Sequence, residues 1–155
     1  MKKLLFLLTM LIASISSVYA ADEVTGRAAT FRTQAQAYLR TEGYIANIDD
    51  DGDISFKSES KSYYISVENY DDGVYVNLYS IINTEGENQY KVLKAANKAQ
   101  HSLKFVRINS VGDSAITINF THYFDSITQF KTLFPDMLYV VKEARTRTID
   151  NFAEL

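Results

Sequence analysis

The run DDDGD at residues 49–53 is the first group of side chains in the sequence that could bind a metal ion. A calcium loop supplies oxygen ligands at alternate positions, glycine at its sixth position and a bidentate glutamate at its twelfth. Counted from Asp49, those two positions hold Ile54 and Ser60. The run therefore does not match an EF-hand, and it is left as a weak alternative site for surface Ca²⁺. The candidate ligands of that alternative site are Asp49, Asp51 and Asp53.

The two histidines of the chain, His101 and His122, are the next candidates for metal binding or acid–base chemistry. His101 falls where a helix should end, and a cation is favoured there by the helix dipole. His122 falls in a strand, on the face that we expect to be the core, which favours a hydrogen-bonded core residue. Neither has a second histidine or a carboxylate at a metal-ligand spacing. We therefore predict no histidine-based metal centre.

Motifs for covalent and nucleotide chemistry are missing from the sequence. It contains no G-x-S-x-G elbow, no G-x-G-x-x-G loop and no Walker loop. It also contains no cysteine, which excludes disulfides, thiolate metal sites and cysteine nucleophiles. We therefore predict a protein that is not an enzyme and that needs no cofactor.

Tyrosine is the residue type that stands out, with 11 Tyr and 9 Phe but no Trp. In the predicted strands 61–68 and 74–82, alternation places several tyrosines on the side opposite the aliphatic residues. Aromatic side chains are enriched in the cores of protein interfaces. The pattern predicts a protein-binding face, with the alternative that a helix covers this face and makes it a third layer. The predicted interface residues are Tyr64, Tyr75, Tyr79 and Ile81.

A meander over residues 44–83 must position these tyrosines. Short alternating runs predict strands at 44–49, 53–58, 61–68 and 74–82. Asp51-Gly52 and Asp72-Gly73 mark two turns, because glycine accepts positive φ without a steric cost. Two further strands are predicted at 103–110 and 115–124.

Three helices complete the predicted elements. Apolar residues at helical spacing predict helices over 25–42 and 88–101, with Gly43 as the C-cap of the first. A long helix begins after Asp125 or Ser126, and Pro135 either kinks it or marks its start. Residues 145–155 have weak periodicity, which predicts either a frayed tail or a tail that docks through Ile149 and Phe152. The order α-β-β-β-β-α-β-β-α predicts an α+β fold, an antiparallel sheet with helices packed on one face.

The first twenty residues have the pattern of a cleavable signal peptide. Lys2 and Lys3 precede an apolar run over 4–15, and Val18-Tyr19-Ala20 ends with small residues at the cleavage positions. The apolar run is shorter than the roughly 20 residues that span a membrane. We therefore predict residues 1–20 as signal peptide, cleavage after Ala20 and one α+β domain over 21–155. The mature protein is then periplasmic or secreted, with no membrane attachment.

The formal net charge is −3 at pH 7, and the acidic side chains concentrate in the first half of the chain. Nucleic-acid binding needs lysine and arginine to replace the counterions of the phosphates. The charge therefore argues against a nucleic-acid partner. An uneven distribution of this kind is compatible with an acidic docking face or with self-association.

The order of elements, together with several short stretches, resembles the family of type III secretion chaperones and YbjN-type sensory transduction regulators. The matching stretches are YLRTEGY at 38–44, IDDDGDISFK at 48–57, YYI at 63–65, AANK at 95–98 and FK at 130–131. The resemblance implies a small acidic protein, usually dimeric, that binds extended segments of partners and is not an enzyme. Secretion chaperones act in the cytoplasm, whereas this chain carries an export signal. The expectation is therefore an exported protein-binding module with a homodimer, protein or peptide partner. The alternative is a periplasmic binder of a small ligand or Ca²⁺.

Overall fold

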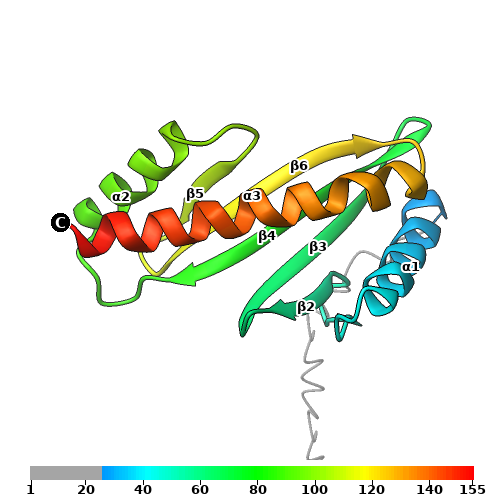
Figure 1. Cartoon of the computed structure of the whole chain (residues 1–155), viewed down its shortest axis with the longest axis horizontal. Coiled ribbons are helices and arrows are strands. Elements are labelled where there is room, and N and C mark those ends of the chain that lie inside the picture. The colour runs from blue at the N-terminus through cyan, green and yellow to red at the C-terminus, as the bar shows by residue number, and fades with distance from the viewer. Residues whose placement is uncertain (1–25) are drawn as a thin grey trace, which may run out of the picture.

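The computed structural model describes residues 26–155, and the predicted signal peptide lies outside the described residues. These residues form three helices and a six-stranded sheet (Figure 1). The helices are α1 (Gly26–Thr41), α2 (Gln89–His101) and α3 (Ile127–Ala153). The strands are β1 (Asn47–Ile48), β2 (Ile54–Ser58), β3 (Lys61–Tyr70), β4 (Gly73–Asn83), β5 (Arg107–Val111) and β6 (Ala115–Phe124).

The sheet is antiparallel throughout, in the order β1-β2-β3-β4-β6-β5. Its three long strands, β3, β4 and β6, are neighbours at the centre. The helices pack on one face of the sheet. Helix α3 runs along the molecule, α1 lies near the N-terminal end of α3, and α2 lies beside the C-terminal end of α3 (Figure 1). This arrangement confirms the predicted α+β fold and the predicted order of elements.

Local sequence signals account for the ends of the helices. Gly43 adopts a φ of +89°, in the left-handed region that favours glycine, directly after α1. The backbone N–H of Tyr44 then donates to the carbonyl of Leu39 at 3.0 Å. Ser126 is the N-cap of α3, because its hydroxyl accepts a hydrogen bond from the backbone N–H of Gln129.

The core between the helices and the sheet is aromatic, and Phe130 on α3 lies at its centre. The Phe130 ring is fully buried. Its centroid lies 5.6 Å from the ring of Phe31 on α1 and 5.6 Å from the ring of Phe124 on β6, both in edge-on geometry. Edge-to-face pairs of this kind add to the stabilisation from burial itself. One side chain therefore joins two helices to the sheet.

Pro135 neither starts α3 nor ends it, because the helix is continuous from Ile127 to Ala153. Proline has no backbone N–H, so the carbonyl four residues earlier, at Lys131, has no helical donor. The hydroxyl of Tyr38 on α1 donates to that carbonyl at 3.4 Å. The contact between α1 and α3 thus satisfies a backbone group that the proline leaves free.

Two predicted boundaries were wrong. The strand expected over 44–49 is shortened to β1, and the strand expected over 103–110 begins at Arg107, after Phe105 adopts a φ of +65°. Of the two alternatives for residues 145–155, the docked tail is correct, since α3 extends to Ala153. The end of α3 is held by α2, because Phe152 packs against the small cluster around Val92 and Glu154 pairs with Lys98. These contacts are between elements distant in sequence, so local periodicity does not reveal them.

Across residues 26–155, no helix combines the length and the apolar character that crossing a bilayer requires.

Phe130→Ala should remove the central contact of the core. We expect a loss of about 3–5 kcal/mol in the free energy of unfolding, the usual cost of truncating a buried phenylalanine. Phe105→Ala is the matched control, because the Phe105 side chain is 80 % exposed, and it should change stability by about 0.5 kcal/mol or less. Urea denaturation followed by circular dichroism measures both, and equal losses would contradict the assignment of Phe130.

Candidate functional site

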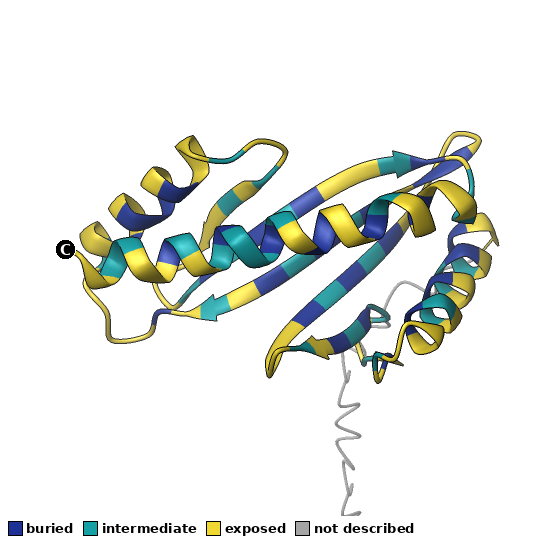
Figure 2. Cartoon of the chain, in the orientation of Figure 1, coloured by how far each residue is buried: buried dark blue, intermediate teal, exposed yellow. Residues whose placement is uncertain are grey.

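The face of the sheet opposite the helices carries the predicted interface residues. Figure 2 shows buried positions alternating with intermediate or exposed ones along much of β4 and β6. Tyr75 is 37 % exposed and Ile81 is 44 % exposed, whereas Tyr64 and Tyr79 are partly buried by their neighbours on the same face. In the part of the chain that the structure describes, all three helices pack on the other side. Of the two alternatives, the structure therefore shows an uncovered face rather than a third layer.

Sequence reasoning missed two further tyrosines on this face, Tyr70 at the end of β3 and Tyr123 on β6. The rings of Tyr70 and Tyr75 have centroids 4.4 Å apart, and Tyr123 lies 5.9 Å from Tyr75 and 6.2 Å from Tyr70. The register that pairs β4 with β6 brings Tyr75 opposite Tyr123. We call the following set the tyrosine face: Tyr64, Tyr70, Tyr75, Tyr79, Ile81 and Tyr123.

Gly73 makes room for this cluster. It lies opposite Tyr70 in the pairing of β3 with β4. A Cβ atom at Gly73 would come within 2.5 Å of both the Tyr123 ring and the carbonyl oxygen of Phe124. Any larger residue must therefore displace both the Tyr123 ring and the backbone at Phe124.

The second aromatic pair of the face joins it to the acidic turn. Tyr64 and Tyr79 stack with centroids 5.1 Å apart. The Tyr79 hydroxyl donates to Oδ2 of Asp53 at 2.6 Å. Burial, together with the Asp53 carboxylate, raises the pKa of Tyr79 well above its usual range. Burial also raises the pKa of Asp53, against the hydrogen bond from Tyr79, which lowers it.

A neutral polar strip lies between the two aromatic groups. Nδ2 of Asn77 donates to Oδ1 of Asn119 at 3.2 Å, and the Thr121 hydroxyl donates to Oδ1 of Asn77 at 3.1 Å. A shallow hollow over the strip is lined by Ser66, Glu68, Tyr75, Asn77 and Thr121. The neighbouring strands β4 and β6 carry no charged side chain on this side.

The Asp49–Asp53 turn uses its carboxylates to hold its own backbone. Oδ1 of Asp49 accepts hydrogen bonds from the backbone N–H groups of Asp51 and Asp53, at 3.2 and 2.9 Å. The Asp53 carboxylate is engaged by Tyr79. Within residues 26–155, no group of three or more Asp, Glu or His side chains is arranged to hold a metal ion. The geometry therefore gives no support to the calcium alternative at Asp49, Asp51 and Asp53.

The position expected for His122 was wrong in one respect. Its neighbours Phe120 and Phe124 are buried on the helix side as expected, but His122 itself is exposed. β5 pairs with β6 only as far as Asn119, so the second half of β6 lies at an open edge of the sheet. His101 ends α2, as predicted.

Tyr123 and Asp72 form the hydrogen-bonded pair at the other end of the face. The Tyr123 hydroxyl donates to Oδ1 of Asp72 at 2.6 Å. This bond raises the pKa of Tyr123 to about 12 and lowers the pKa of Asp72. The Asp72 carboxylate, in the turn between β3 and β4, thus orients the Tyr123 ring.

The first prediction from this site concerns alkaline pH. The pKa of Tyr123 is about 12 in the folded chain against an ordinary value of 10.0. Between those two pH values the folded state binds more protons than the unfolded state. The stability that the Tyr123–Asp72 hydrogen bond contributes is therefore complete below pH 10 and is lost as the pH rises toward 12. Asp72→Asn should lower the pKa of Tyr123, measured by spectrophotometric titration of tyrosinate. Asp71→Asn is the control, and an equal shift in both variants would contradict the pairing.

The second prediction concerns Gly73. Gly73→Ala should lower the free energy of unfolding by about 1–3 kcal/mol, the usual cost of overpacking, and should weaken the near-ultraviolet circular dichroism of the tyrosines. The same substitution should cost less in a Tyr123→Ala background, because the ring that it strikes is gone. Equal costs in both backgrounds would show that the ring is not the obstacle.

Comparison with known proteins adds no family assignment, since the chain matches no family model, no curated protein and no solved structure. The resemblance to secretion chaperones stays a prediction.

Proposed function

We propose that this chain is an exported, non-enzymatic protein-binding module that binds a second copy of itself through the tyrosine face. The observation that carries the proposal is a sheet face rich in aromatic side chains on the side away from all three helices. In an antiparallel sheet with one face in water, the residues that point to the water are normally polar. Exposed aromatic groups gathered on one face are typical of protein interaction sites.

The distribution of charge supports a second copy as the occupant. Charged residues are depleted from the centres of protein interfaces, and β4 and β6 contribute only neutral side chains to this face. Glu68 on β3 and Arg107 on β5 flank these two strands. A two-fold axis parallel to the strands, placed between β4 and β6, packs the neutral strands of one copy on those of the other, so no like charges are brought together there.

The hydroxyl groups of the face favour the same interpretation. Tyr79 and Tyr123 donate to carboxylates within the chain, so these polar groups have partners before any copy docks. Desolvating a polar group that keeps its hydrogen bond costs far less than burying an unpaired one. The rings of Tyr79 and Tyr123 can therefore pack against a second copy without leaving their own hydroxyl groups unpaired.

The test replaces Tyr70 and Tyr75 by serine together, since both rings are exposed and neither is part of the buried core. Sedimentation velocity should show that the wild type self-associates. The dissociation constant should rise at least about tenfold in the double variant, because aromatic side chains at interfaces commonly contribute more than 1 kcal/mol each. Circular dichroism should remain unchanged.

Tyr139→Ser is the matched control, because Tyr139 lies on α3 and is 66 % exposed. It should self-associate like the wild type. A wild-type protein that stays monomeric at every concentration would contradict the proposal, and so would equal weakening by Tyr139→Ser.

A further inference from the structure

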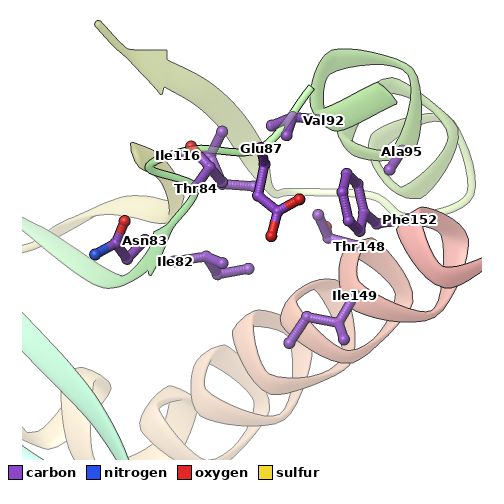
Figure 3. A pocket seen from close by; sticks show the side chains of 10 residues that line it. All are labelled: Ile82, Asn83, Thr84, Glu87, Val92, Ala95, Ile116, Thr148, Ile149 and Phe152. Carbon is purple, nitrogen blue, oxygen red and sulfur yellow. The ribbon is translucent and has the colours of Figure 1, made fainter. Parts of the chain in front are cut away.

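A pocket of about 110 Å³ lies between the end of β4, α2 and the C-terminal half of α3 (Figure 3). It is on the helix side of the sheet, away from the tyrosine face. Its walls are largely aliphatic and aromatic. They include Ile82, Val92, Ala95, Ile116, Ile149 and Phe152.

The small side chains of α2 explain why space remains there. α2 presents Ala95, Ala96 and Ala99 as buried residues. The cluster that it forms with Ile116 is small and separate from the main core around Phe130. Alanine fills little volume, so the helix lies close to its neighbours without filling the space between them and Phe152.

Two polar groups distinguish this pocket from a packing defect. Thr84 is only 5 % exposed, and among residues 26–155 its hydroxyl oxygen has no hydrogen-bond partner. The other hydroxyl of the lining, on Thr148, donates to the carbonyl of Ala144 at 2.7 Å. Native proteins rarely leave a buried hydroxyl unpaired, because its desolvation is then uncompensated. Thr84 therefore points to a missing partner.

The second polar group is the carboxylate of Glu87. Figure 3 shows it reaching from the segment after β4 into the pocket, toward Phe152 and Thr148. Glu87 is exposed, so it lies at the mouth rather than in the depth of the pocket. A negative charge there favours a cation and repels an anion.

We propose that this pocket binds a small molecule with an apolar body of about one ring and an ammonium group. The ring lies against Ile82, Val92 and Phe152, and the ammonium donates hydrogen bonds to Glu87 and to the Thr84 hydroxyl. At about 110 Å³ the pocket is smaller than the apolar cavity of roughly 150 Å³ that accepts benzene, so a single ring fills it and the ammonium group is left toward the mouth. The site is independent of the tyrosine face and does not rest on the proposed function.

The experiment compares three probes with nearly the same body, namely benzylamine, toluene and benzoate, by chemical-shift titration of the mature protein. Benzylammonium should bind most tightly, toluene less tightly and benzoate least. The shifts should centre on Val92, Ala95 and Thr148. If no probe perturbs these residues at millimolar concentration, the proposal is wrong. If benzoate binds as well as benzylammonium, the assignment of an ammonium ligand is overturned.

Three variants locate the site. Ala95→Leu should fill the pocket and abolish binding of toluene and benzylammonium alike. Glu87→Gln should lower the affinity for benzylammonium about fivefold and leave the affinity for toluene unchanged, as expected for a partly exposed ion pair. Glu85→Gln, an exposed neighbour outside the lining, should change neither affinity, and an effect equal to that of Glu87→Gln would contradict the role of Glu87.

Thr84→Val keeps the shape of the side chain and removes only the hydroxyl, so it tests the site even if Ala95→Leu perturbs folding. This variant should lower the affinity for benzylammonium and leave the affinity for toluene unchanged. Unchanged affinity for benzylammonium would remove Thr84 from the site.

Discussion

The packing of Phe130 against α1 and β6 is the contact on which the rest of the structure depends. It holds α1 and α3 on the same face of the sheet, and Tyr38 strengthens the arrangement by donating to the carbonyl that Pro135 leaves free. Because all three helices are used on that face, the other face has to meet solvent with its own side chains. One-sided coverage therefore creates both the core and the tyrosine face.

The tyrosine face combines packed aromatic rings with hydrogen-bonded hydroxyl groups. Tyr79 and Tyr123 direct their hydroxyl groups to carboxylates in two turns, while their rings pack on neighbouring tyrosines. Tyrosine suits this position because its ring can be packed while its hydroxyl finds a polar partner. The carboxylates of the acidic turn at Asp49–Asp53 hold the backbone of the turn and one of these rings. Tyr79 and Tyr123 thus contribute aromatic rings to the face while their hydroxyl groups keep hydrogen-bond partners.

β4 links the two surfaces proposed to bind ligands. Along its length it presents Tyr75 and Tyr79 to one side and buried aliphatic residues to the other, and beyond its end Thr84 and Glu87 line the pocket beside α2. The two surfaces differ in the chemistry that they offer. The flat face suits a macromolecular partner, whereas the pocket has room for about one ring. They also lie on opposite sides of the sheet, so that occupation of one leaves the other accessible.

The sequence by itself determined the class and order of elements, and the side of the sheet to which Tyr64, Tyr75, Tyr79 and Ile81 point. Strand alternation, the glycine after α1 and the serine before α3 are local signals, and local physics is sufficient to interpret them. Only the tertiary structure decided that no helix within residues 26–155 covers those tyrosines, that Tyr70 and Tyr123 join them, and that His122 is exposed at an open edge. It also decided that the last turns of α3 are ordered against α2 and that a pocket remains between them. Each of these outcomes depends on strand register or on packing between segments far apart in the chain, and no local pattern encodes either of them.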